Sequence, residues 1–142
     1  MKLSISKDET LLILEFLAES KEHLDGMEEK ILKLEVIKDN ELVNSIFRPI
    51  HTIKGTSSFL HIENISFFSH EFETLLDDIR KNRIKEIEPK LIDLLLESLD
   101  VLSTMLLNLE TALDSVNLAQ DIIEVNVEGI EYKNVLDRLI AF

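Results

Sequence analysis

The sequence contains no cysteine, no tryptophan and a single tyrosine, and only three glycines and two prolines occur among its 142 residues. Without cysteine, a disulfide framework, a thiolate zinc site and thiol catalysis are excluded, and a reducing compartment is compatible with the composition. Glycine and proline separate short strands in all-β folds, so their scarcity argues against such a fold. The composition therefore favours an all-helical protein.

Positive charge is also scarce. Fifteen Lys and Arg residues stand against 28 Asp and Glu residues, which gives a formal net charge of -13. Such a chain repels the phosphate backbone of nucleic acids and anionic membrane surfaces. We therefore expect no nucleic-acid binding, and a protein with a basic or metal-bearing face is the favoured partner.

No apolar run is long enough for a membrane helix. The longest charge-free run extends from Val101 to Leu109, whereas a membrane-spanning helix needs about 20 apolar residues. The N-terminal "MKLSISKDE" becomes acidic where a signal peptide would need its apolar segment. We expect a cytoplasmic protein without membrane insertion.

Four stretches carry apolar residues at alternating spacings of three and four, which is the period of one buried helix face. The first begins after Ser6, where "SKDE" has the spacing of a capping box, and predicts one long helix that ends near Leu34. Asn40 is the expected N-cap of the second helix, and Glu88-Pro89 fits the start of the fourth. The expected buried faces are Ile13, Leu17, Ser20, Leu24, Met27, Ile31 and Leu34; Ile46, Ile50, Ile53, Ser57 and Leu60; Ile65, Phe68, Phe72, Leu75 and Ile79; and Ile92, Leu95, Leu99, Leu102, Leu106, Leu109 and Leu113.

These patterns predict one domain over residues 1–142: an antiparallel, up-and-down four-helix bundle over 7–113 and an extension over 114–142. Pro49 removes a backbone hydrogen bond inside the second helix and is expected to kink it. The phenylalanines at positions 67, 68 and 72 are expected to be core residues. In the extension, apolar residues alternate briefly at positions 123, 125 and 127, and a short fifth helix is expected to pack Ile130, Leu136 and Ile140.

The stretch "FRPIHTIKGTSSFL" places a histidine on the polar side of the second helix. At about 100° per residue, His51 lies roughly 140° from the buried stripe, so its imidazole is expected to be exposed. Gly55 lies one turn later on the same side, where glycine costs about 1 kcal/mol relative to alanine in a helix. We expect this glycine to clear a path to the imidazole, although close packing against a neighbouring helix would also explain it.

The third helix offers polar partners for that histidine. His70 and Glu73 lie three residues apart outside the phenylalanine stripe, so antiparallel packing would bring Glu73 towards His51. A carboxylate there would fix the imidazole tautomer and leave the other ring nitrogen free to attack. Lys54 could offset the charge of an arriving phosphate. The group suits a histidine that carries a phosphoryl group.

Together, "FRPIHTIKGTSSFL", "SHEFETLLDDIR" and "LIDLLLESLDVL" resemble the histidine phosphotransfer (HPt) domain, most closely the N-terminal phosphoacceptor domain of CheA-type chemotaxis histidine kinases. The resemblance covers about residues 9–113. It implies that His51 is the phosphorylated histidine, that Lys54 and Gly55 belong to its H-x-x-K-G motif, and that Glu73 and His70 form a polar network with it. The chain departs from related sequences at His61, where they usually have glycine.

The resemblance further implies a phosphorelay role in two-component chemotaxis signalling. His51 would accept phosphate from a histidine kinase catalytic domain or a phospho-aspartate and pass it to a response-regulator receiver domain, while the partner domains supply ATP and Mg²⁺. The chain itself would bind no cofactor or metal and would have no independent catalytic activity. We expect partners to dock on an exposed face around Phe47, Gly55 and Ser58.

Several alternatives stand beside this interpretation. A helical scaffold that binds another protein without phosphate chemistry is the main one. A di-iron bundle is disfavoured, because the chain has no Glu-x-x-His pair. His23 and His61 lack comparable partners and are assigned no function. The sequence fits either a stand-alone carrier or the first part of a longer CheA-like kinase.

Overall fold

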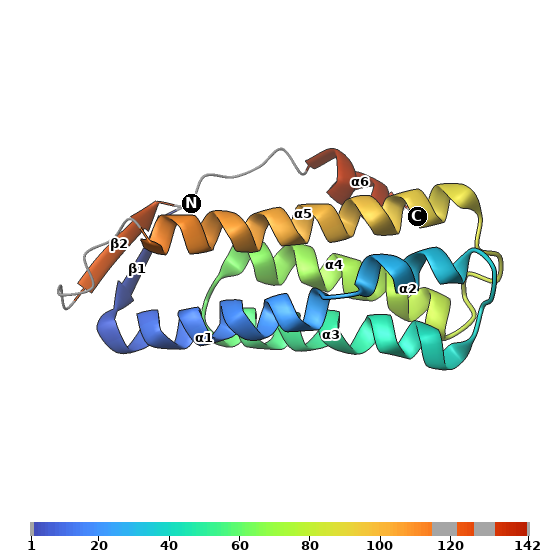
Figure 1. Ribbon diagram of the computed structural model, residues 1–142. Coiled ribbons are helices and arrows are strands. Elements are labelled where there is room, and N and C mark those ends of the chain that lie inside the picture. The colour runs from blue at the N-terminus through green and yellow to red at the C-terminus, as the bar shows by residue number, and fades with distance from the viewer. Residues whose placement is uncertain (1, 115–121, 127–132, 142) are drawn as a thin grey trace.

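The computed structural model describes residues 2–114, 122–126 and 133–141. In chain order the elements are β1 (Lys2–Ser6), α1 (Lys7–Leu24), α2 (Met27–Leu34), α3 (Asn40–Phe59), α4 (Glu63–Arg80), α5 (Pro89–Asp114), β2 (Ile122–Asn126) and α6 (Lys133–Ala141). Figure 1 shows long helices running side by side, with the two strands at one end of the bundle and α6 beside α5. The predicted helical bundle with a short C-terminal helix is confirmed.

The first predicted helix is two helices. It begins as expected, because the Ser6 hydroxyl accepts a hydrogen bond from the Glu9 backbone N–H at 3.2 Å. The prediction of one helix through Leu34 is wrong, since α1 ends at Leu24 and Gly26 takes a left-handed conformation with φ of 74° before α2. The apolar stripe keeps its spacing across this break, so periodicity does not reveal it.

The two helices that carry the candidate site, α3 and α4, make the most extensive helix contact among the described elements. The cap of α3 is Asp39, whose carboxylate accepts from the Glu41 N–H at 3.0 Å, so the expected cap at Asn40 is one residue off. Pro49 lies inside α3, and the helix continues to Phe59. The predicted kink at Pro49 stays a prediction.

The turn between α3 and α4 depends on a histidine with φ of 60°. The His61 N–H donates to the Ser58 carbonyl at 3.1 Å, and the Ile62 N–H donates to the Ser57 carbonyl at 2.9 Å. These two bonds form a Schellman motif, which closes a helix on a left-handed residue that is usually glycine. His61 therefore ends α3 in the conformation that glycine adopts without strain.

Replacing His61 with glycine should stabilise the fold. The strain released at a left-handed residue is about 1–2 kcal/mol, whereas glycine loses an extra 0.5–1 kcal/mol of conformational entropy on folding. We expect the free energy of unfolding in urea to rise by roughly 0.5–1 kcal/mol. His61→Ala retains the Cβ atom and should show no such gain; an equal gain in both variants would contradict the explanation.

The core forms as the four stripes predict, with two exceptions at helix ends and one among the aromatics. Every stripe residue is buried except Leu24 and Leu60, which are half-buried. Phe68 and Phe72 are fully buried, but Phe67 is 51% exposed, so its assignment to the core is wrong. Phe67 immediately precedes Phe68 of the buried stripe. Because a helix turns by about 100° per residue, its side chain lies outside the buried face of α4.

Two small hydroxyl residues are buried on the helices that carry the site, one on α3 and one on α4. Ser57 and Ser69 are both fully buried. The Ser57 hydroxyl donates to the Ile53 carbonyl at 2.6 Å on its own helix, whereas the Ser69 hydroxyl has no hydrogen-bond partner among the described residues. Ser57 lies six residues after His51 on α3, and Ser69 lies four residues before Glu73 on antiparallel α4, so the serines lie at nearly the same level.

The C-terminal extension contributes a strand and a helix. β1 pairs with β2 in an antiparallel ladder that sets Leu3 opposite Val125. The sequence shows the apolar alternation in the region of β2, but β1 was not predicted. The expected helix is α6, which packs on α4 and α5. Leu136 packs half-buried against the core as expected, and Leu139 is buried, but Ile140 is 60% exposed, so its expected burial is wrong. Positions 127 and 130 lie outside the described residues. The assignment of residues 1–142 to a single domain stays a prediction.

None of the helices over the described ranges combines the length and the hydropathy that crossing a lipid bilayer requires.

Candidate functional site

The antiparallel packing of α3 and α4 brings His51 and Glu73 together. The His51 Nδ1 atom lies 3.1 Å from Glu73 Oε1. The imidazole is 58% exposed and the Glu73 side chain only 15% exposed, so the carboxylate lies in the groove between the helices and the ring faces solvent. The two side chains meet as expected, although they are 22 residues apart in the chain.

The hydrogen bond with Glu73 determines which ring nitrogen of His51 is free. An ionised carboxylate only accepts hydrogen bonds, so Nδ1 carries the proton. In the neutral imidazole, Nε2 then holds an unshared electron pair. The exposed histidine therefore presents a nucleophilic nitrogen.

Lys54 completes a three-residue cluster. Its Nζ atom donates to Glu73 Oε1 at 3.3 Å and lies 3.0 Å from Oε2. One ammonium and one carboxylate beside a neutral imidazole give the cluster no net charge. An incoming phosphoryl group would meet a cation one helical turn from Nε2, despite the acidic character of the whole chain.

Gly55 and Ser58 are both exposed on α3, as predicted. A Cβ atom built on Gly55 would meet nothing within 4 Å. Close packing against a neighbouring helix therefore does not explain this glycine. The space beside Gly55 is open, which is the condition that the expected approach path requires.

Phe47 departs from its expected place. It was predicted on an exposed docking face, but it is only 8% exposed. Its ring stacks on the His51 ring, with centroids 5.7 Å apart and planes 14° apart, and the Arg80 guanidinium carbon lies 4.0 Å from the Phe47 ring centroid. Phe47 therefore lies beneath the imidazole. Sequence reasoning missed Arg80, because only the register of α4 against α3 brings it here.

The other three histidines lie apart from this cluster. His70 is exposed on α4, and its ring forms no hydrogen bond with a described residue; its backbone carbonyl accepts from the Thr74 hydroxyl at 2.9 Å. The structure thus does not bring His70 into the expected network. His23 is exposed on α1, and His61 forms the turn after α3.

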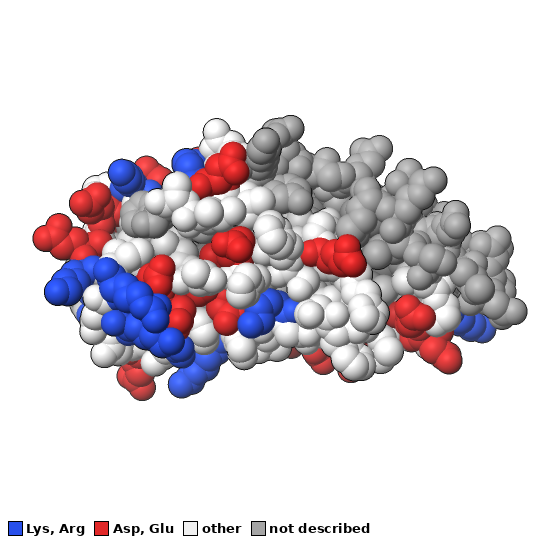
Figure 2. All heavy atoms as spheres, turned by 180° about the vertical axis from the view of Figure 1, so that it is seen from behind, with Lys and Arg blue, Asp and Glu red and all other residues white. Residues whose placement is uncertain are grey.

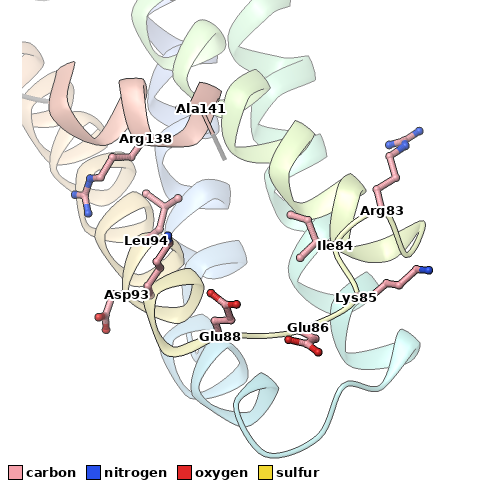
Figure 3. A pocket seen from close by; sticks show the side chains of 10 residues that line it. Arg83, Ile84, Lys85, Glu86, Glu88, Asp93, Leu94, Arg138 and Ala141 are labelled. Carbon is pink, nitrogen blue, oxygen red and sulfur yellow. The ribbon is translucent and has the colours of Figure 1, made fainter.

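A pocket of about 900 Å³ lies elsewhere, between the α4–α5 connection and α6. Figure 3 shows Arg83 and Lys85 pointing away from Arg138 across it, so these basic groups do not converge on one point. Over the described ranges no three His, Asp or Glu side chains are grouped to hold a metal ion. That the chain binds no cofactor of its own stays a prediction.

Comparison with known proteins agrees with this site. Residues 12–140 match the model of the Hpt domain. The chain is 35% identical over 119 residues to the sensor histidine kinase CheAY of Helicobacter pylori and 39% identical over 114 residues to the chemotaxis protein CheA of Bacillus subtilis; these alignments cover 82% and 80% of this chain. The CheA phosphotransferase domain from Thermotoga maritima superposes with a TM-score of 0.62 at 30% identity, covering 68% of this chain and 92% of that domain.

The chain belongs to the Hpt domain family. Its relatives within that family are CheA chemotaxis proteins, and it spans about 15% of the length of the curated relatives described above.

Proposed function

We propose that this Hpt domain is a phosphoryl carrier whose acceptor atom is His51 Nε2. The observation that carries the proposal is the exposed imidazole whose Nδ1 is held at 3.1 Å by the Glu73 carboxylate. Histidine forms covalent intermediates when a neighbouring base or acceptor fixes its tautomer. No other described histidine has a side-chain acceptor of this kind.

The cluster suits the charge changes of the reaction. Nε2 attacks the γ-phosphorus of ATP, the bond from that phosphorus to the bridging oxygen breaks, and ADP leaves with the electron pair. Positive charge develops on the imidazole as the N–P bond forms, and the Glu73 carboxylate at Nδ1 stabilises it. Lys54 lies where it can balance the charge of the phosphoryl oxygens. A kinase catalytic domain would supply ATP and Mg²⁺.

The onward partner in this proposal is the receiver domain of a response regulator. Its aspartate carboxylate attacks phosphorus, the N–P bond breaks, and the imidazole regains its electron pair with its proton still on Nδ1. The domain thereby returns to its starting state. Since the proposed donor reaction uses ATP, we place the domain in the cytoplasm.

The direct test is a labelling experiment. The purified chain is incubated with the catalytic domain of a CheA-type kinase, Mg²⁺ and γ-³²P-ATP, with the phosphoacceptor domain of that kinase as positive control. We expect a label that is lost in acid and stable in base, as an N–P bond requires, and that moves to an added receiver domain. An unlabelled chain beside a labelled control would favour the helical scaffold instead.

Gly55 should affect the docking of the kinase domain near His51 more than the reactivity of the imidazole itself. Gly55→Gln is expected to raise the free energy of unfolding by about 0.5–1 kcal/mol, because glutamine is a far better helix former and the position is open. Its long side chain should obstruct the docked partner, so the phosphorylation rate by the kinase domain should fall by about tenfold or more, which corresponds to 1.4 kcal/mol.

A small phosphoryl donor separates the two effects of that substitution. Phosphoramidate needs no docking face, so it should label Gly55→Gln as fast as the wild-type chain. Ser45→Gln, a half-buried position nearer the start of α3, serves as the matched control. Equal kinase rates for the wild-type chain and Gly55→Gln would contradict the assignment of Gly55 to the approach path.

A further inference from the structure

A single hydrogen bond leaves the His51 imidazole free to pivot. The bond to Glu73 fixes the position of Nδ1, but the ring can still turn about the line that joins Nδ1 to Oε1. Such a rotation would move Nε2, because that atom lies on the far side of the ring. Phosphoryl transfer depends mainly on positioning, so a second constraint on the ring plane has a direct use.

The Phe47 ring supplies that constraint. Phe47 precedes His51 by four residues on α3, a spacing that puts both side chains on one face of the helix. Their planes differ by 14° and their centroids are 5.7 Å apart, which is the offset stacking that aromatic pairs prefer. The stack restricts the tilt of the imidazole while the bond to Glu73 restricts its in-plane position.

Arg80 holds the Phe47 ring in turn. Its guanidinium carbon lies 4.0 Å from the Phe47 centroid, within the range of a cation–π interaction. Phe47 is therefore in contact with a cation from α4 and an imidazole from its own helix. With only 8% of Phe47 exposed, its ring has little freedom to leave this arrangement.

Asp77 anchors Arg80. Arg80 donates to Asp77 Oδ1 from Nε at 3.1 Å and from a terminal nitrogen at 2.6 Å. Burial acts to raise the pKa of Asp77, but hydrogen bonds from Lys81 and Arg80 outweigh it and hold that pKa below the ordinary value. The anchoring carboxylate is thus ionised at neutral pH. Figure 2 shows basic and acidic side chains interspersed at this end of the bundle.

We propose that Arg80 and Phe47 are positioning residues for His51: Arg80 holds the Phe47 ring, and that ring holds the imidazole plane with Nε2 directed to solvent. Arg80 would act through Phe47, and Phe47 through the orientation of the imidazole ring. The consequence for phosphorylation rests on the proposed function, whereas the positioning is a property of the unphosphorylated chain. In the alternative, Arg80 only covers Phe47 with its apolar stem. Removing its positive charge would then leave the orientation of the imidazole unchanged.

The first test replaces Arg80 with glutamine, which keeps much of the side chain and removes the cation. Arg83→Gln is the matched control: Arg83 also pairs with Asp77, at 3.7 Å, and with Asp78, at 2.8 Å, but it is Arg80 that lies over the Phe47 ring. The shifts of the His51 ring protons report the stack through the ring current of Phe47. We expect them to move towards random-coil values in Arg80→Gln and to stay unchanged in Arg83→Gln.

The phosphorylation rate gives the second measurement. The Arg80 side chain is still 34% exposed, so its cation–π contact belongs to the weaker part of the known range, and the rate of Arg80→Gln should fall about two- to fivefold. Arg80→Lys retains the cation and should restore part of both signals. Phe47→Leu keeps an apolar side chain but removes the flat ring, so it should abolish the ring-current shift and slow labelling further. Urea unfolding shows whether each variant is folded.

The outcomes separate the two proposals. If the ring shifts respond as expected but a competent kinase labels no variant, the positioning stands and the proposed function fails. If Arg80→Gln retains the wild-type ring shifts while folded, the positioning proposal is overturned, even where its rate falls. A rate loss in Arg80→Gln without a ring-shift change would instead assign Arg80 to partner docking.

Discussion

Replacement of His51 by glutamine will abolish the acid-labile label that a CheA-type kinase domain transfers to this chain. Glutamine keeps a hydrogen-bonding group of similar reach but has no nucleophilic ring nitrogen. The imidazole is 58% exposed and contributes little to the core, so the free energy of unfolding should change by no more than about 0.5 kcal/mol. Loss of the label from a folded protein then reports the chemistry alone.

His23→Gln is the matched control for that experiment. His23 is exposed on α1, outside the cluster of His51, Lys54 and Glu73, so this variant should be labelled like the wild-type chain. Full-strength label on His51→Gln would show that another residue is the acceptor. A mass shift mapped to any peptide other than the one that contains residue 51 would overturn the assignment equally.

Substitution of Glu73 by glutamine will slow phosphorylation of His51 by roughly 10- to 100-fold, by analogy with the loss of a hydrogen-bond partner that orients a metal-bound histidine. The amide no longer offers a charged acceptor to Nδ1, so the ring spends more time with its proton on Nε2, where it cannot attack. The positive charge that develops during the reaction also loses its partner carboxylate. Lys54 loses the ion pair at 3.0 Å.

Nitrogen-15 NMR of the unphosphorylated protein measures the cause directly. The two ring nitrogens should show a shift of the proton from Nδ1 towards Nε2 in Glu73→Gln, at a pH where the ring is neutral. Glu71→Gln, two residues away on α4 and outside the cluster, should change neither the tautomer nor the rate. An unchanged tautomer in Glu73→Gln would remove this residue from the proposed mechanism.

Much of the site follows from periodicity alone. The stripe that includes Ile50 and Ile53 defines the buried face of α3. The positions of all other α3 side chains relative to this face then follow from the helical period. The exposure of His51 and the open space at Gly55 are consequences of this geometry, and both are observed. Glu73 could be predicted because α3 and α4 are joined by a short turn and must run antiparallel.

The misses have different causes, and the first is that helical period carries no information about the rotation of one helix relative to another. Phe47 lies only one residue from the buried stripe, so small differences in helix rotation decide whether it is exposed; it is covered because Arg80 arrives from α4. The break at Gly26 was missed because the apolar spacing continues through it. β1 was not predicted because its partner strand is more than a hundred residues away in the sequence, and a short strand gives little local signal.

The buried serines between α3 and α4 have a consequence for the reach of Glu73. A glutamate side chain is short, and it can bridge two helices only where their backbones approach closely. Ser57 and Ser69 are buried at nearly the same level of the two helices, where larger side chains such as leucine would tend to separate the helix axes. We therefore expect side-chain volume at this level to act as a spacer that sets the 3.1 Å hydrogen bond at His51.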